Sequence, residues 1–180
     1  MNIHKPFELA VPVQAIDHWI GDAHAPVTLV EYGDFECPHC KQAAPLVKRL
    51  GERFASHIQI VFRHFPLEEV HSHALHAALA AEAAGGQGKF CPMHDVLFEH
   101  RLHLTLHQLR GYAESLELDM ERYDADMEDD IYLQRVREQI DGGRLSGVRA
   151  TPTFYINGKL QDVSYGLQSL LQGVEAALHK

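Results

Sequence analysis

Two short runs of apolar and β-branched residues, 27–32 and 58–62, flank an amphipathic segment that begins at Pro38. Runs of this length, bounded by turn-forming residues, predict buried strands. Between them, apolar residues recur at helical spacing to about Phe54, and Pro38 suits the first helical turn, where its missing N–H would have no partner. Pro45 lies inside this predicted helix and is expected to kink it. A helix that joins two such strands predicts that they pair in parallel.

The chain then has a helical pattern from His71 to about Gly147, without a run typical of a strand. Glycine pairs at 85–86 and 142–143 indicate helix breaks or C-terminal caps, because glycine readily adopts the conformation that ends a helix. The spacing of apolar residues predicts helices over 73–84, 89–100 and 106–116, then a short acidic helix, then a helix over 131–145.

Beyond Pro152 the pattern returns to strands. Residues 153–156 are β-branched or aromatic, the Asn-Gly dipeptide at 157–158 is typical of a type I′ hairpin turn, and residues 159–163 predict the returning strand. An amphipathic helix is expected over 167–178. The order β-α-β, helices, β-β-α predicts a single α/β domain with an inserted helical subdomain, preceded by an irregular start.

Composition is that of an ordinary globular protein, with 46% hydrophobic and 23% charged residues. Acidic residues outnumber basic ones by 25 to 16, and no Lys/Arg run suits phosphate binding, so we expect no nucleic-acid partner. No segment approaches the roughly 18 apolar residues of a membrane span, so we expect no membrane partner either. The start lacks the apolar region of a secretory signal, which predicts a cytoplasmic protein, or a periplasmic one if a leader has been removed.

The residues that carry chemistry are Cys37 and Cys40, which lie where the first predicted strand meets the following helix. Free N–H groups and the helix dipole favour an anion at a helix N-terminus, and the thiolate is the nucleophilic form of cysteine. We therefore expect Cys37 to be the attacking thiol, with Pro38 in the first helical turn and His39 adding a hydrogen-bond donor or a positive charge. Cys40 is expected to be more buried and to resolve a mixed disulfide by attacking Cys37.

Other candidate residues have simpler interpretations. A zinc site normally needs a second cysteine pair, and only Cys91 remains, so we expect no metal and interpret Cys91 as a small buried hydrophobe. Tyr32 and Phe35 are expected to be core or rim aromatic residues beside the thiols, and His64 has no assigned role. Two groups of histidines at helical spacing are interpreted as solvated faces: His71, His73 and His76, and His100, His103 and His107.

Residues 31–40, together with residues 151–153, resemble the DsbA-like branch of the thioredoxin superfamily. The resemblance extends over nearly the whole chain and includes the inserted helices. It implies a thioredoxin-like α/β fold with the following parts: one domain over 1–180, a thioredoxin core over 15–66 and 148–180, and a helical insertion over 67–147.

The resemblance also implies roles for residues outside the dithiol. Pro152 is expected to follow a cis peptide bond and to face the dithiol. Thr151 is expected to offer its backbone to an extended substrate there. The alternative is a trans proline that opens an edge strand. Glu31 falls where the superfamily places a buried acid that accepts the proton of Cys40, and burial would raise the pKa of this carboxyl. The alternative is a glutamate that faces solvent. Arg63 is a candidate partner for Glu31.

These observations predict a thiol–disulfide oxidoreductase that needs neither an organic cofactor nor a metal. The expected partners are protein or small-molecule thiols and disulfides, together with a further protein that recycles the dithiol. Two alternatives stay open on the same sequence. One is an isomerase of small glutathione adducts on the same fold, and the other is a redox-controlled chaperone or metal-binding protein.

Overall fold

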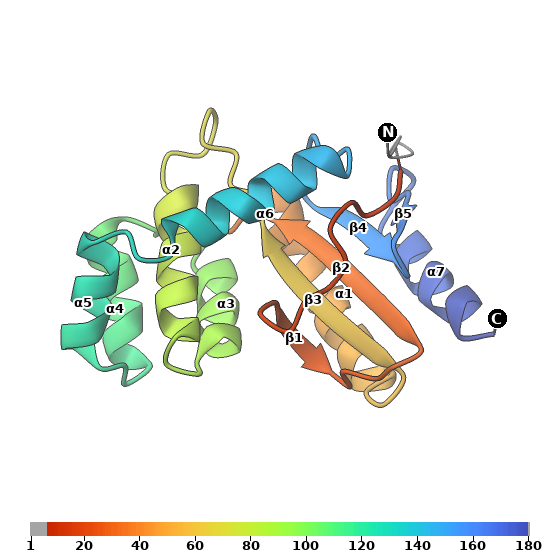
Figure 1. The fold of residues 1–180 in the computed structure, drawn as a ribbon, viewed down its shortest axis with the longest axis horizontal. Coiled ribbons are helices and arrows are strands. Elements are labelled where there is room, and N and C mark those ends of the chain that lie inside the picture. Colours follow the sequence, from red (N-terminus) through yellow and green to blue (C-terminus); the bar gives the residue numbers. More distant parts are fainter. Residues whose placement is uncertain (1–6, 180) are drawn as a thin grey trace.

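The computed structural model describes residues 7–179, so residues 1–6 and 180 of the expected domain lie outside the described part of the chain. A five-stranded mixed sheet forms the centre of the molecule, in the order β1-β3-β2-β4-β5 (Figure 1). Strands β2 and β3 are parallel, as predicted, and the other neighbouring strands are antiparallel. The strands are β1 (His18–Gly21), β2 (Val27–Gly33), β3 (Ile58–His64), β4 (Thr153–Ile156) and β5 (Lys159–Gln161).

Helices cover both faces of the sheet because successive residues of each buried strand point to opposite faces. Leu29 and Ile60 face α1 (Pro38–Arg53) and α7 (Gln168–Leu178), whereas Val30 and Val61 pack against side chains of α2 and α6 on the other face. Figure 1 shows α6 crossing the face of the sheet opposite α1. Glu31 alternates with Val30 along β2 and so lies on the α1 face.

The inserted subdomain consists of α2 (Ala74–Gly85), α3 (Phe90–Glu99), α4 (Leu106–Ser115), α5 (Met120–Glu128) and α6 (Leu133–Leu145). The predicted helices are confirmed to within a few residues at each end. Helix α2 is the centre of this subdomain: nine of its 12 residues are buried, and seven of those nine are alanine. Small side chains allow the neighbouring helices to approach closely on several sides, which explains why this helix is not amphipathic.

The prediction missed β1, which forms an antiparallel edge beside β3. Three of its four residues are exposed, so the strand lacks the alternation of apolar and polar residues that would have identified it.

The predicted returning strand is shorter than expected and ends at Gln161. Helix α1 continues past Pro45, whose ring is exposed. The hairpin turn has positive φ angles at Asn157 (48°) and Gly158 (76°), which a type I′ turn requires.

A buried carboxylate joins the sheet to the inserted helices. Glu82 of α2 is 1% exposed, and its oxygens lie 2.9 Å from Nε2 of His18, 2.9 Å from Nε2 of His64 and 3.0 Å from Nε of Arg135. Burial acts to raise the pKa of Glu82, but its bonds with His18 and His64 outweigh burial and hold the pKa below its usual range. The carboxylate therefore connects β1, β3, α2 and α6 as a charged group with several partners.

We predict that Glu82→Ala destabilises the fold by about 3–5 kcal/mol, because it removes the shared partner of several buried polar groups. Denaturant unfolding at neutral pH measures this change. The matched control is Glu114→Ala, which removes an exposed partner of Arg110 and should cost about 1 kcal/mol or less. Equal losses in the two variants would contradict the structural role of Glu82.

Candidate active site

Both cysteines are placed by the turn that connects β2 to α1. Cys37 is the N-cap residue of α1, with φ −72° and ψ 125°, and Pro38 occupies the first helical turn. The N–H of Cys37 donates to the carbonyl of Asp34 at 3.1 Å, and the N–H of Glu36 donates to Oδ1 of Asp34 at 2.8 Å. The chain thus reverses tightly after the strand, and the Cys37 side chain lies at the N-terminal end of the helix.

The loop between β3 and α2 holds this turn in place. Oδ2 of Asp34 accepts a hydrogen bond from the N–H of Leu67 at 2.9 Å and lies 2.8 Å from Nδ1 of His71. Glu36 accepts a hydrogen bond from the N–H of His73 at 2.8 Å. The interpretation of His71 as part of a solvated histidine face was therefore wrong, because its ring lies against Asp34 in the segment before the dithiol. His73 bonds to the same segment, but its side chain is 41% exposed. Their partners lie far away in sequence and could not be found from helical spacing.

The two thiols differ in acidity. The Cys37 side chain is nearly buried, and its Sγ lies 3.3 Å from the carbonyl oxygen of Thr151. A hydrogen bond from the Cys40 thiol, helped by bonds from the backbone N–H groups of Cys40 and His39, lowers the pKa of Cys37 to about 5 against the opposing effect of burial. Burial raises the pKa of Cys40, and the neighbouring charges of Glu31 and Cys37 raise it further. At neutral pH the thiolate therefore forms at Cys37.

His39 and Pro38 stand between the two cysteines, and both are exposed. The stabilisation of the Cys37 thiolate by His39 comes from its backbone N–H. The peptide bond between Thr151 and Pro152 is cis, and the Thr151 carbonyl is the group that contacts the Cys37 thiol. The segment before β4 thus lies beside the dithiol, where the sequence-based interpretation placed it.

Glu31 is buried on the α1 side of β2, with 2% of its surface exposed, and its Oε1 atom has no hydrogen-bond partner among residues 7–179. Burial, and to a lesser degree the charge of Cys37, raises the pKa of this carboxyl to about 8. The carboxyl in turn contributes to the raised pKa of Cys40. A carboxyl of this kind can accept a proton from a nearby thiol at a pH close to neutral.

The predicted pairing of Arg63 with Glu31 was wrong. Glu31 pairs in register with Phe62, so Arg63, the next residue of β3, points to the opposite face of the sheet. There its guanidinium binds the carboxylate of Asp17 at 3.0 and 2.8 Å and the Tyr32 hydroxyl at 3.1 Å. Arg63 therefore stabilises the chain before β1 and leaves Glu31 without a cationic partner on that strand.

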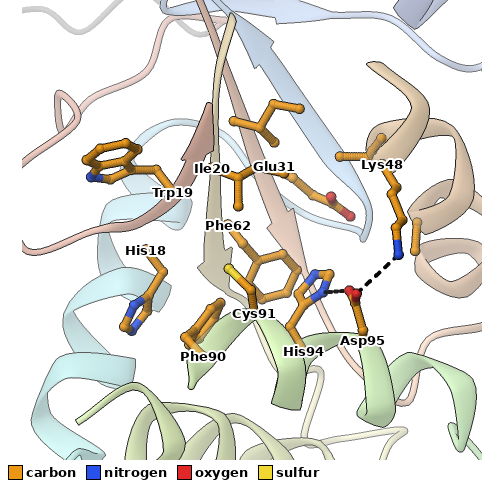
Figure 2. A pocket seen from close by; sticks show the side chains of 13 residues that line it. His18, Trp19, Ile20, Glu31, Lys48, Phe62, Phe90, Cys91, His94 and Asp95 are labelled. Carbon is orange, nitrogen blue, oxygen red and sulfur yellow. Dashed lines mark hydrogen bonds and ion pairs between the residues drawn. The ribbon is translucent and has the colours of Figure 1, made fainter. Parts of the chain in front are cut away.

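The expectation that Cys91 is a buried small hydrophobe was also wrong. Cys91 is an exposed residue of α3 and lines a pocket that also contains Glu31 (Figure 2). Partial burial of its thiol, together with the charge of Asp95, raises the pKa of Cys91.

Tyr32 and Phe35 are fully buried and belong to the core. Within residues 7–179, no three His, Cys, Asp or Glu side chains are grouped in a way that suits a metal ion.

The sheet order and the dithiol at the start of α1, beside a cis-proline segment, define a thioredoxin-like domain with a helical insertion. The family model described as thioredoxin matches residues 14–176, and the chain belongs to this family. This chain superposes on oxidised BdbD from Bacillus subtilis with a TM-score of 0.86 and 22% sequence identity. The superposition covers 98% of this chain and 100% of the BdbD chain. The thiol-disulfide exchange protein alpha-DsbA2 from Wolbachia pipientis gives a TM-score of 0.76 and 21% identity, over 90% and 87% of the two chains. At these identities the likeness establishes the DsbA-like fold.

A curated relative is much more similar in sequence but much longer. The protein named Na(+)/H(+) antiporter NhaA 1 from Salinispora arenicola is 47% identical over 171 residues, which is 94% of this chain and 26% of that protein. The chain thus spans about a quarter of the length of this relative. Between residues 7 and 179, no helix is both long and apolar enough to cross a membrane.

We predict that Glu31→Gln changes how stability depends on pH. A carboxyl whose folded pKa is raised contributes stability below its unfolded pKa of about 4.3, and this contribution is lost as the pH rises through the folded pKa of about 8. The variant has no carboxyl to ionise and does not lose this stability. As the pH rises from about 4.3 to about 8, the free energy of unfolding of the variant minus that of the parent should therefore increase by up to about 5 kcal/mol. Denaturant unfolding of the reduced proteins across this range measures the difference. A pH-independent difference would show that Glu31 is not buried as a neutral acid.

Proposed function

We propose that the protein is a thiol–disulfide oxidoreductase that uses Cys37 as the nucleophile and Cys40 as the resolving thiol. The observation that carries this proposal is the opposite change in the acidity of the two thiols: the pKa of Cys37 is lowered to about 5, and that of Cys40 is raised. Membership of the thioredoxin family and the shared fold with a thiol-disulfide exchange protein support the same reaction.

The proposed reaction has two exchange steps. In the first step the Cys37 thiolate attacks one sulfur of a substrate disulfide, a mixed disulfide forms, and the other substrate sulfur leaves as a thiolate. In the second step the ionised form of Glu31 accepts the proton of Cys40, and Cys40 attacks the Cys37 sulfur and releases the second substrate sulfur as a thiolate. The dithiol has then given two electrons to the substrate and become a disulfide. In the oxidised protein the same steps run in reverse.

The segment around the cis-proline is the proposed substrate-binding element. The Thr151 carbonyl lies against Cys37, so an extended chain that pairs with the backbone of Thr151 and Pro152 would bring its disulfide next to the attacking sulfur. The proposed substrates are protein or small-molecule thiols and disulfides, and a separate redox protein would return the dithiol to its starting state. Sulfur exchange of this kind needs no organic cofactor or metal.

We predict that Cys40→Ala captures substrates as mixed disulfides that persist, because the attacking thiol remains and the resolving thiol is lost. Cys37→Ala should capture no substrate, since the pKa of Cys40 is raised and little thiolate forms there. Non-reducing electrophoresis and mass spectrometry of the protein after incubation with a disulfide-containing peptide measure the adduct.

The matched control for trapping is Cys91→Ala, which removes the third cysteine and should leave disulfide exchange within a few-fold of the parent. Capture by Cys37→Ala but not by Cys40→Ala would reverse the assigned roles. Loss of activity in Cys91→Ala would place Cys91 in the reaction. Stoichiometric zinc binding by the reduced protein, without any exchange activity, would favour the metal-binding alternative.

We predict that reduction stabilises the protein more as the pH rises. A thiol whose folded pKa is lowered contributes stability above its unfolded pKa of about 8.5, and this contribution is lost as the pH falls through the folded pKa of about 5. The oxidised protein has no thiolate, so the reduced form should be the more stable one at about pH 8 and should lose this advantage towards pH 5. Unfolding of both redox forms, with thiolate absorbance at each pH, measures this.

Glu31 titrates in both redox forms, so comparison of the two forms at each pH largely isolates the contribution of Cys37. An oxidised form that is more stable at every pH, together with a Cys37 pKa near 8.5, would contradict the assignment of Cys37 as the acidic thiol. It would also indicate a dithiol that acts as a reductant.

A further inference from the structure

A pocket of about 160 Å³ lies between the sheet, α1 and α3, on the face of the sheet that carries Glu31 (Figure 2). Its walls are mainly apolar and come from four elements: Ile20 of β1, Val47 of α1, Ile60 and Phe62 of β3, and Phe90 of α3. Ile20 is 39% exposed, so the pocket opens to solvent past β1. An apolar cavity of about 150 Å³ is large enough for a benzene ring.

The charged groups of the pocket outside Glu31 already have partners. Lys48 and Asp95 form an ion pair at 3.5 Å, and Nδ1 of His94 lies 3.0 Å from the Asp95 carboxylate. Lys48 and Asp95 are both largely exposed, which places this group at the rim of the pocket. A charged ligand would have to compete with these bonds and with bulk water.

Glu31 is the polar group inside the pocket. Its carboxyl extends from β2 between the α1 and α3 sides (Figure 2). Its Oε1 atom is buried and has no hydrogen-bond partner within the described part of the chain. Burial raises the pKa of Glu31 to about 8, so the carboxyl is mainly protonated at neutral pH and can donate one hydrogen bond and accept another. A carboxamide is the complementary neutral group, because it also has a donor and an acceptor side by side.

We propose that this pocket, called here the Glu31 pocket, binds a small neutral molecule that consists of an apolar ring and a carboxamide. The ring lies against Ile20, Phe62 and Phe90, and the carboxamide bonds to the Glu31 carboxyl. The occupant is a free small molecule, since the pocket accommodates little more than one ring. Binding satisfies the buried Oε1 atom and removes water from apolar walls.

A bound ligand also acts on the dithiol, and this part of the inference rests on the proposed function. Glu31 contributes to the raised pKa of Cys40 and is the proposed acceptor of the Cys40 proton. A carboxamide bonded to Glu31 holds the carboxyl in its protonated form, which cannot accept the proton of Cys40. The ligand therefore slows release of the mixed disulfide by Cys40 and leaves the first attack by Cys37 unchanged.

Binding is tested with benzamide as the probe and with toluene and benzoate as its apolar and anionic counterparts. Two-dimensional NMR titration of the reduced protein at neutral pH should show shifts confined to residues of β1, β2, α1, α3 and β3. Benzamide should bind about tenfold more tightly than toluene, which lacks the hydrogen bonds. Benzoate should bind more weakly than benzamide, because its charge loses hydration in an apolar pocket.

Variants separate the hydrogen bond from the shape of the pocket. Glu31→Leu should remove the preference for benzamide over toluene, whereas Glu31→Gln, which keeps a donor and an acceptor, should retain it. Ala44 lines the pocket from α1, and Ala44→Leu should fill it and weaken benzamide binding about tenfold. Absence of shifts in the parent, or a preference that survives Glu31→Leu, would overturn the proposed site. If Glu31→Leu does not fold, the titrations of the parent and of Ala44→Leu still decide whether benzamide binds in this pocket.

The effect on exchange is measured by single-turnover kinetics of mixed-disulfide formation and release. Saturating benzamide should slow release several-fold in the parent without changing formation, and release by Ala44→Leu should not respond. Unchanged release in a parent that binds benzamide would overturn the link to Cys40. A parent without any exchange activity would instead contradict the proposed function, while the NMR titration would still decide on the site.

Discussion

The structure around the dithiol depends on the stabilisation of one negative charge, the Cys37 thiolate, in a site that water barely reaches. Cys37 is 4% exposed, and burial by itself would raise its pKa. Hydrogen bonds from Cys40 and from the backbone at the start of α1 outweigh burial. Once this charge is present, the nearby Glu31 and Cys40 ionise less readily, since like charges repel in a poorly solvated site. The acidity of all three groups is therefore set together.

The inserted helices and the loop before them keep this arrangement rigid. Glu82 connects α2 and α6 to the sheet through His18, His64 and Arg135, and the loop before α2 bonds to the turn that precedes Cys37 through Asp34. Movement of the insertion would break buried polar contacts, which is costly. The helical subdomain thus has a structural role in addition to covering the sheet.

Local periodicity was sufficient for most of the fold. Strands β2 and β3, helix α1 and the inserted helices each bury a characteristic set of side chains, so their residues follow the spacing of the element. The exposed edge strand β1 has no such pattern and was missed. Arg63 was assigned to the wrong face because its orientation depends on the register of β3 against β2, which sequence spacing does not reveal. Cys91 and His71 were misjudged because burial and partners depend on distant segments.

By itself, the sequence determined the order of elements, the hairpin turn and the position of Cys37 at a helix N-terminus, because each depends on residues within one or two turns of the chain. The tertiary structure decided the surroundings of these residues. It brought Thr151 against Cys37, placed His71 on Asp34, and buried Oε1 of Glu31 where no described residue bonds to it. Acidity and hydrogen bonding depend on distance in space and on loss of solvent, and both are fixed only when segments far apart in the chain pack together.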